Sequence, residues 1–378
     1  METGSLKRVL FLTGTRADFG KIKPLIKNLD SNPDFETQVF VTGMHLMKRY
    51  GSTANEVIRS NFKNVFLYMN QDATYHQSMD FTFANTVNGL GRYIREFPAD
   101  LMVIHGDRIE AMAGALVGVL NNMRVAHIEG GELSGTIDDS LRHAISKLAH
   151  LHFVANDEAR VRLIQMGEKP ESIYVIGSPD IDVMLSKALP DIAEVKSHYE
   201  INFDDYFILL VHPVTTEIDS LESNLEELTQ AIEASGKNFV VIYPNNDLGA
   251  ETIFKAYQEL EENPHFRILP SVRFEYFLTL LKHSGGIVGN SSAGIREASV
   301  YGVPTIDVGT RQNRRLKHTS IVSVGWERKA ILHALQSLPK STPVSLNFGS
   351  GDSAEQFLKA LQTDALWQLP IQKEFCDL

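Results

Sequence analysis

Short runs of Val, Ile, Leu and Phe recur along the chain, and each is followed by a polar or glycine-rich turn and then by helical periodicity. Residues 8–12 form the first run, and after the turn at 14–16 the apolar residues of 22–29 follow the i, i+3, i+4, i+7 spacing of an amphipathic helix. Further runs lie at 38–42, 101–105, 124–128, 152–155 and 173–176. Strands that are apolar throughout and separated by helices predict a parallel sheet buried on both faces.

A second series of strands begins at 207–211, after the stretch 185–205, which carries Pro190, mixed charges and no strand pattern. Its later members lie at 239–243, 266–269, 286–289 and 303–307, with amphipathic helices around 221–232 and 274–281. The sequence therefore predicts two doubly wound, Rossmann-like α/β domains that face a cleft, the first at 6–184 and the second at 185–357.

The composition limits the classes of function. In 378 residues, 36 Lys and Arg against 47 Asp and Glu give a net charge of −11 at pH 7, which disfavours binding to nucleic acid or to an anionic membrane. The only cysteine is Cys376, which excludes an internal disulfide and a Cys-rich zinc site. No apolar stretch approaches the roughly 18 residues of a membrane helix, and residues 1–5 lack the features of a signal peptide. We therefore expect a cytoplasmic protein.

Polar residues at the ends of the predicted strands are the candidates for chemistry, because ligands bind beyond the carboxyl ends of parallel strands. After the first strand, the turn 14–21 opens a helix and carries Arg16 and a lysine, which suits a phosphate, although a plain turn with solvated charges is an alternative. Asp107, Glu129 and Asp138 follow later strands of the same domain. Each acid alone could be a helix cap, but clustered carboxylates raise one another's proton affinity and so can supply an acid and a base.

The second domain offers a histidine and a helix start. His212 follows the strand 207–211 directly, where an imidazole can meet a phosphate oxygen, although a structural role is the alternative. The stretch 289–294 leaves a strand and opens a helix with Ser291 and Ser292, so that hydroxyl and N–H groups converge on an anion. Glu297, further along, can accept hydrogen bonds from a ribose diol or be an ordinary surface residue.

Two further motifs carry less weight. Gly289-x-Ser291-x-Ala293 approximates the nucleophile elbow of α/β-hydrolases, but the chain lacks a His-Gly-Gly-Gly-type oxyanion motif and has two predicted sheets in place of one. Asp180-Ile181-Asp182 is similar to the metal-binding Asp-x-Asp of some sugar transferases, and an acid pair at a helix start explains it better. No recognised metal-ligand spacing appears, so we expect neither a metal ion nor another cofactor.

Several of these residues belong to an ordered series of motifs. The series comprises Gly14-Thr15-Arg16-Ala17-Asp18, Val41-Thr42-Gly43-Met44-His45, Gly106-Asp107-Arg108, His127-Ile128-Glu129-Gly130-Gly131-Glu132, Ser134-Gly135-Thr136-Ile137-Asp138-Asp139-Ser140-x-Arg142-His143, His212-Pro213-Val214-Thr215-Thr216 and Gly289-Asn290-Ser291-Ser292. In order and spacing, from Arg8 to about Arg315, it resembles the hydrolysing UDP-N-acetylglucosamine 2-epimerases.

The resemblance implies the two-domain glycosyltransferase-B architecture, in which a C-terminal helix, here 352–361 or the tail near 358–378, packs back on the first domain. It implies conversion of UDP-N-acetylglucosamine and water to UDP and N-acetylmannosamine, which enters the synthesis of sialic and related nonulosonic acids. The family's catalytic residues fall on Asp107, Glu129, Asp138 and His212. Its nucleotide contacts fall on Arg16, Arg108, Asn245, Val272, Ser291, Ser292, Glu297 and Arg311.

The resemblance leaves the exact substrate open. Non-hydrolysing bacterial relatives usually carry a Pro-Glu-Glu-x-x-Arg segment where this chain has residues 137–143, and that difference favours hydrolysis. Related enzymes act on UDP-N,N'-diacetylbacillosamine or GDP-N-acetylglucosamine on the route to legionaminic acid. The sequence is also compatible with a non-hydrolysing epimerase, a glycosyltransferase-B enzyme or a sugar-nucleotide sensor. Since relatives are often dimers or tetramers, a homodimer or homotetramer is implied.

Overall fold

The structure, a computed structural model, describes residues 6–71, 78–134, 136–313, 315 and 317–377. The chain folds into two compact units. The first unit contains the chain up to Glu132, residues 138–185 and the segment from Asn347 onward, and the second contains residues 133–137 and 186–346. Gly135, which belongs to one of the predicted motifs, lies outside the described residues.

The first unit is built on a parallel sheet, for which the described residues provide seven strands in the order β3-β2-β1-β4-β5-β6-β7. The strands are β1 (Lys7–Thr13), β2 (Phe35–Val41), β3 (Val65–Leu67), β4 (Leu101–His105), β5 (Arg124–Ile128), β6 (Leu151–Val154) and β7 (Ile173–Val175). The order reverses between β1 and β4, which is the switch point of a doubly wound sheet.

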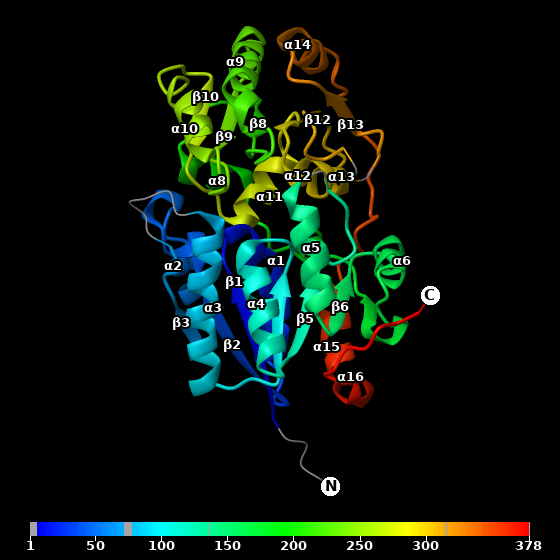
Figure 1. The fold of residues 1–378 in the computed structure, drawn as a ribbon. Coiled ribbons are helices and arrows are strands. Elements are labelled where there is room, and N and C mark those ends of the chain that lie inside the picture. The colour runs from blue at the N-terminus through cyan, green and yellow to red at the C-terminus, as the bar shows by residue number, and fades with distance from the viewer. Residues whose placement is uncertain (1–5, 72–77, 135, 314, 316, 378) are drawn as a thin grey trace. The chain divides into compact units, whose positions relative to one another are not determined.

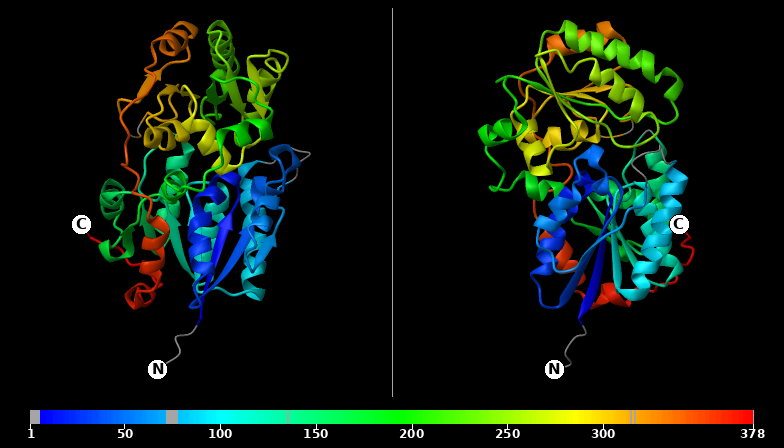
Figure 2. Two further views of the ribbon diagram at one scale, coloured as in Figure 1. Left: turned by 180° about the vertical axis from the view of Figure 1, so that it is seen from behind. Right: turned by 90° about the vertical axis from the view of Figure 1, so that its left-hand side faces the viewer.

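Helices cover both faces of this sheet, as the sequence pattern predicts (Figures 1 and 2). The helices of this unit are α1 (Arg16–Asp30), α2 (Ala54–Arg59), α3 (Met79–Glu96), α4 (Ile109–Leu120), α5 (Ile137–Leu148), α6 (Asp157–Gln165), α7 (Pro179–Met184), α15 (Ser353–Leu361) and α16 (Asp364–Gln368), with short 3₁₀ turns at Gly43–Leu46, Lys48–Tyr50 and Pro170–Ser172. Val9 and Phe11 of β1 pack with α1, α2, α15 and α16. Leu10 and Leu12, which alternate with them, pack with α3, α4 and α5 on the other face.

The chain returns to the first unit at Asn347, ahead of residue 358. The backbone carbonyl of Phe348, a buried residue, accepts a hydrogen bond of 2.6 Å from the N–H of Ser178. At the start of α15, the carboxylate of Asp182 accepts hydrogen bonds from the N–H groups of Ser353 (2.9 Å) and Ala354 (2.7 Å). Asp182 therefore caps α15, which agrees with the interpretation of Asp180-x-Asp182 as a structural acid pair.

The second unit repeats the architecture with a parallel sheet of six strands within its described residues, in the order β10-β9-β8-β11-β12-β13. The strands are β8 (Phe207–Leu210), β9 (Phe239–Ile242), β10 (Phe266–Leu269), β11 (Ile287–Gly289), β12 (Thr305–Val308) and β13 (Ile321–Val324). Here the order reverses between β8 and β11. The predicted fold of two doubly wound α/β sheets is confirmed.

Seven helices of this unit lie in the described residues: α8 (Ile192–Tyr199), α9 (Ile218–Ala234), α10 (Ala250–Gln258), α11 (Phe274–Lys282), α12 (Ser292–Ile295), α13 (Glu297–Tyr301) and α14 (Arg328–Ser337). Leu209, Val288 and Ile306 of the central strands pack with α9, α10 and α14. The helix expected after Ser291 is interrupted at Arg296, so Glu297 begins a separate short helix. No helix within the described ranges is both long and apolar enough to cross a membrane.

Candidate active site

Several predicted site residues of each unit follow the strands at which the strand order reverses, or a strand next to them. Arg16 begins the helix after β1, Asp107 and Arg108 follow β4, and Glu129 follows β5. His212 lies just past β8, whereas Ser291 and Ser292 follow β11. The crevice at a switch point is the usual binding place of an open parallel sheet. The fold therefore gives both units a polar edge in the position where such proteins bind ligands.

Glu129 lies in a small cluster of polar groups. Its Oε1 atom is 3.3 Å from Nζ of Lys21, 3.3 Å from Nε2 of His105 and 3.2 Å from Oγ of Ser178. Lys21 is also 3.7 Å from the carboxylate of Asp180, a side chain that is fully buried. Glu129 has a positive φ of 68°, which is uncommon for a residue with a side chain and is typical of functional turns. The fold thus places the Glu129 carboxylate between Lys21 and His105, two side chains that can hold or exchange a proton.

Asp107 and Asp138 belong to a second cluster, centred on the buried guanidinium of Arg142. Arg142 forms ion pairs with Asp107 and, at 2.9 Å, with Asp139, and it donates a hydrogen bond to the carbonyl of Glu132. Burial by itself lowers the pKa of Arg142, but the carboxylates of Asp107, Glu132, Asp139 and Asp138 outweigh it and raise the pKa. A buried, permanently charged arginine can therefore hold these partly exposed acids together.

The turn after β1 differs from the sequence-based expectation of a phosphate-binding backbone. The N–H groups of Gly14 and Thr15 each donate to the carboxylate of Asp18 at 3.0 Å, and Thr15 caps α1 through a capping box with Asp18. These two N–H groups are therefore not available to a phosphate, because the helix supplies its own anion. Burial raises the pKa of Asp18, while its hydrogen bonds from Thr13 and Gly14 oppose the rise.

Two arginines predicted to contact a nucleotide are oriented by carboxylates of their own unit. Nε of Arg16 lies 2.9 Å from Glu56 on α2, and Nε of Arg108 lies 3.3 Å from Glu110 on α4. Glu110 is almost fully buried beside Gly14 and fixes the direction of Arg108. The guanidinium groups are therefore positioned before any ligand arrives, which lowers the entropy cost of using them.

In the second unit, His212 is fixed by two asparagines. Its backbone N–H donates to Oδ1 of Asn290 at 2.7 Å, and Nδ2 of Asn290 donates back to the carbonyl of His212 at 2.8 Å. The backbone N–H of Asn245 donates to Nδ1 of His212 at 3.1 Å. Since Nδ1 is an acceptor, the neutral imidazole carries its proton on Nε2 and can donate it to an anion.

The remaining predicted residues of the second unit follow β10, β11 and β12. Ser291 caps α12 and Ser292 is its first residue, while Glu297 is buried at the start of α13. Arg311 and Gln312 both donate to the carbonyl of Asn290, at 3.3 Å and 2.9 Å. Val272 is a buried residue two positions before α11.

Sequence reasoning missed the partners of the acids. Lys21, His105, Ser178 and Asp180 surround Glu129, and Arg142 joins Asp107 to Asp139. Lys21 was expected only as a cation for a phosphate and Asp180 only as part of an acid pair, and none of the five was predicted as a partner of these acids. Arg142 did leave a signal, because it shares the buried side of α5 with Ile145 and Ser146. A charged residue on the buried face of an amphipathic helix needs a partner and points to a polar site.

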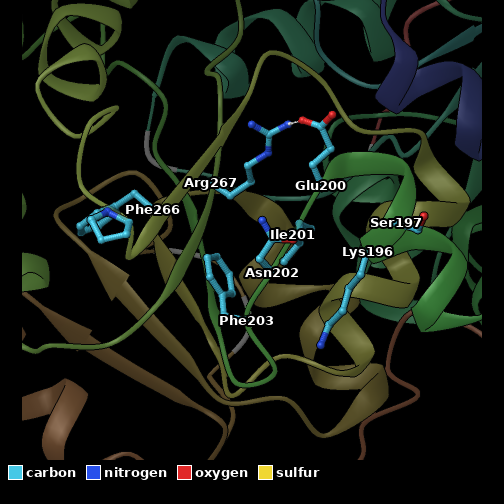
Figure 3. A pocket seen from close by; sticks show the side chains of 9 residues that line it. Lys196, Ser197, Glu200, Ile201, Asn202, Phe203, Phe266 and Arg267 are labelled. Carbon is cyan, nitrogen blue, oxygen red and sulfur yellow. Dashed lines mark hydrogen bonds and ion pairs between the residues drawn. The ribbon is translucent and has the colours of Figure 1, made fainter.

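A pocket of the second unit lies apart from these residues (Figure 3). It has a volume of about 560 Å³ and is formed by the end of α8, the loop after it and the start of β10. Its lining contains none of the predicted site residues, and its Arg267 is already paired with Glu200 at 2.8 Å. In the described part of the chain, no group of three or more His, Cys, Asp or Glu side chains is arranged to hold a metal ion.

Two doubly wound parallel sheets with polar switch points define this protein as an α/β protein of the glycosyltransferase-B fold. Among solved structures of that fold, a UDP-GlcNAc 2-epimerase of Methanocaldococcus jannaschii in complex with UDP-GlcNAc and UDP superposes with a TM-score of 0.80, at 21% identity over 94% of this chain and 99% of that one. The structure of a Neisseria meningitidis UDP-GlcNAc 2-epimerase bound to UDP-GlcNAc gives 0.78, at 20% identity over 94% and 99%.

The chain belongs to the UDP-N-acetylglucosamine 2-epimerase family, whose model matches residues 27–362. It is 48% identical to a UDP-N-acetylglucosamine 2-epimerase of Neisseria meningitidis serogroup B, over 99% of this chain and 100% of the relative. It is 32% identical to a hydrolysing UDP-N,N'-diacetylbacillosamine 2-epimerase of Legionella pneumophila, over 95% and 96%. The family resemblance seen in the sequence is confirmed.

Proposed function

We propose that this enzyme converts UDP-N-acetylglucosamine and water to N-acetylmannosamine and UDP. The observation that carries the proposal is the acidic edge of the first sheet, where Glu129, Asp107 and Asp138 are each held by a cationic side chain or lie beside one. The reaction must remove a proton from C2 and return one from the opposite face, which calls for more than one carboxyl group. The relative from Neisseria, a UDP-N-acetylglucosamine 2-epimerase at 48% identity, supports this choice of substrate.

The first proposed step is an elimination. A carboxylate accepts the proton of C2 while the bond from C1 to the diphosphate oxygen breaks, which leaves 2-acetamidoglucal and UDP. His212, whose neutral form carries its proton on Nε2, donates to an oxygen of the leaving diphosphate. Arg16, Arg108 and Arg311 add positive charge for that group, whereas Asn245, Val272, Ser291, Ser292 and Glu297 bind the rest of the nucleotide.

The second proposed step is hydration. Water adds to C1 of the double bond, and a carboxylic acid protonates C2 on the face opposite to the one from which the proton was removed. The product is N-acetylmannosamine. Coupled carboxyl groups share protons, so Asp107, Glu129 and Asp138 act as a set. Together the two steps break the C2–H and C1–O bonds and form new ones with no net oxidation or reduction, so the proposed reaction calls for no redox cofactor, and we propose that it uses no metal ion.

Hydrolysis is favoured over epimerisation without release of UDP. At 137–143, where non-hydrolysing relatives usually carry Pro-Glu-Glu-x-x-Arg, this chain places Asp138 and Asp139 beside Arg142. The hydrolysing relative from Legionella is 32% identical over nearly the whole chain. A polysialic acid biosynthesis protein of Escherichia coli is 32% identical over 87% of this chain, which supports a role for the product in sialic acid synthesis.

The test is incubation with UDP-N-acetylglucosamine in D₂O, followed by mass spectrometry and NMR. We expect free N-acetylmannosamine deuterated at C2, together with UDP. A 2-epimer that stays attached to UDP would identify a non-hydrolysing epimerase. A transferase would keep the C2 hydrogen and need an acceptor, a sensor would bind UDP without turnover, and an esterase would ignore uridine nucleotides.

Two variants make the same experiment specific to the proposed acids. Glu129→Gln should lower kcat by about 10² to 10⁴-fold, the usual contribution of a general acid or base. Glu158→Gln, a change to an exposed acid of α6 in the same unit, is the control and should leave kcat unchanged.

A panel of related sugar nucleotides tests the choice of substrate. UDP-N,N'-diacetylbacillosamine is included because of the Legionella relative, and GDP-N-acetylglucosamine tests the nucleotide. We expect the highest kcat/KM with UDP-N-acetylglucosamine.

We also propose that the enzyme acts in the cytoplasm as a homodimer or homotetramer without nucleic-acid or membrane partners. Light scattering of the purified protein tests the oligomeric state.

A further inference from the structure

His127 is a fully buried histidine of β5 that lies beneath two of the proposed catalytic turns. Its Nε2 atom is 2.7 Å from the backbone oxygen of Gly106, and its Nδ1 atom is 3.1 Å from Oγ of Ser146, a buried residue of α5. Burial, with a smaller contribution from nearby positive charge such as that of Arg142, lowers the pKa of His127 to about 3. The imidazole is therefore neutral at any pH at which the enzyme works.

The two contacts fix which nitrogen carries the proton. A carbonyl oxygen only accepts hydrogen bonds, so Nε2 of His127 donates to Gly106. Nδ1 is then an acceptor, and the hydroxyl of Ser146 donates to it. Ser146 thus holds the ring in the tautomer and orientation that the contact with Gly106 needs.

Gly106 immediately precedes Asp107 and adopts a left-handed conformation with φ of 73°. Its N–H donates to the carbonyl of Ile128 at 3.0 Å, and its carbonyl accepts from His127. Both polar groups of this peptide turn are therefore bonded to β5. Asp107 lies between this turn and Arg108, the N-cap residue of α4. The direction of the Asp107 carboxylate therefore depends on the turn.

The turn that carries Glu129 rests on the same pair of side chains. A Cβ atom added to Gly130 would lie 3.0 Å from Oγ of Ser146 and 3.1 Å from Nδ1 of His127. The backbone after Glu129 is thus packed directly on the hydrogen bond between these residues. One buried imidazole therefore supports the turns on both sides of it.

We propose that His127, oriented by Ser146, is a positioning residue that holds the turns of Asp107 and Glu129 in the geometry required for proton transfer. This inference rests on the proposed function. It gives His127 no contact with the substrate, since both ring nitrogens are used within the protein. A displacement of about 1 Å in a reacting group can cost about 10²-fold in rate, so loss of this support should appear mainly in kcat.

The test compares His127→Leu with His127→Gln in steady-state kinetics with UDP-N-acetylglucosamine. Leucine removes both hydrogen bonds and should lower kcat by about 10²-fold with little change in KM. Glutamine keeps an N–H donor near the Nε2 position and should restore kcat to within a few-fold of the original enzyme. Ser146→Ala removes only the orienting hydroxyl and should lower kcat by about 3- to 10-fold, the worth of one hydrogen bond.

The neighbouring strand offers a matched control. His152 of β6 pairs in register with His127, is equally buried, and its side chain bonds Glu168 at 3.0 Å instead of a backbone group of either turn. His152→Leu should lower the unfolding midpoint, because it removes a buried hydrogen bond to a carboxylate, and it should leave kcat within about threefold, because that bond supports neither turn. A loss of kcat in His152→Leu equal to that in His127→Leu, or unchanged kcat in a folded His127→Leu, would overturn the inference.

Hydrogen exchange separates this inference from the proposed function. Peptides that span 105–110 and 129–131 should exchange faster in His127→Leu than in His127→Gln or His152→Leu. If the original enzyme releases no N-acetylmannosamine, the proposed function fails, whereas the exchange rates still decide whether His127 holds the turns. Equal exchange of these peptides in all variants would refute the positioning role, and Ser146→Ala provides the comparison if His127→Leu does not fold.

Discussion

Asp307 is a buried carboxyl group whose charge opposes folding. It lies in β12, is 2% exposed, and pairs in register with Ser323 of β13. Burial raises its pKa to about 6, although a hydrogen bond with Ser323 and the charge of Arg311 oppose the rise. The folded protein therefore binds this proton more tightly than the unfolded chain. Between about pH 4 and pH 6 the contribution of Asp307 to stability falls as the pH rises, and above about pH 6 it stays at its lower value.

Asp307→Asn removes this titration and should stabilise the enzyme at neutral and basic pH. The shift corresponds to about 3 kcal/mol at most, and the gain should shrink as the pH falls below about 6 and vanish near pH 4. Urea unfolding at pH 4.5 and pH 8 measures it. Asp205→Asn, at an exposed position, is the control and should change the free energy of unfolding by less than about 0.5 kcal/mol at both pH values. A gain from Asp307→Asn that is equal at both pH values would contradict the argument.

Residues that end strands could be predicted from the sequence, whereas their partners could not. Glu129 and His212 follow apolar runs directly, so the pattern alone places them at the ligand edge of a parallel sheet. Lys21 reaches Glu129 across 108 positions, and nothing local in the sequence indicates that pairing. The same holds for Arg142 and Asp107, which are 35 positions apart. Tertiary packing determines which charged side chains form ion pairs, and the spacing of these residues in the sequence does not indicate the pairs.

At the scale of elements, both strands that were missed, β3 and β13, lie at sheet edges, whereas the edge strands β7 and β10 were predicted because each keeps a buried apolar residue. β3 and β13 are the last members of their sheets, and their residues are half-buried or exposed. The sequence pattern relies on continuous apolar runs, which only a strand covered on both faces requires. The interruption between α12 and α13 was missed for a related reason, since it depends on the backbone of Arg296 and not on a proline or glycine signal.

The cap of α15 gives a prediction at this scale. Asp182 lies far from α15 in sequence yet accepts hydrogen bonds from two of its first N–H groups. Asp182→Ala should lower the free energy of unfolding by about 0.5–2 kcal/mol, the usual cost of losing a helix cap. Asp352→Ala is the matched control, because Asp352 stands at the start of the same helix and its carboxylate accepts only the exposed side chains of Ser350 and Gln356, with no cap hydrogen bond. Thermal unfolding of both variants tests the difference, and equal losses would show that Asp182 does not act as the cap.

At the scale of the whole molecule, the C-terminal segment is a structural part of the first unit. Phe357 of α15 is fully buried against Phe11 and Phe153, with ring centroids 6.4 Å and 4.7 Å away. Further along, Nζ of Lys373 donates to the buried carboxylate of Glu168 and, at 2.6 Å, to the carbonyl of Ala149. Burial favours the neutral form of Glu168, but its bonds to His152, Lys147 and Lys373 outweigh burial and lower its pKa to about 2. The first unit is therefore complete only when the end of the chain has docked.

Phe357→Ala tests this dependence. Removal of a buried aromatic ring from a core typically costs about 3–5 kcal/mol, so the first unit should lose hydrogen-exchange protection and unfold at lower urea. Peptides of the second unit, whose core of α9, α10 and α14 shares no residue with that cluster, should keep their protection. Phe375→Ala removes the same ring from a side chain that is 90% exposed, so it controls for the composition of the tail and should leave both units unchanged. If Phe357→Ala lowered the hydrogen-exchange protection of the second unit as much as that of the first, the two units would unfold as one cooperative body. The division of the chain after Leu185 would then not correspond to two units of separate stability.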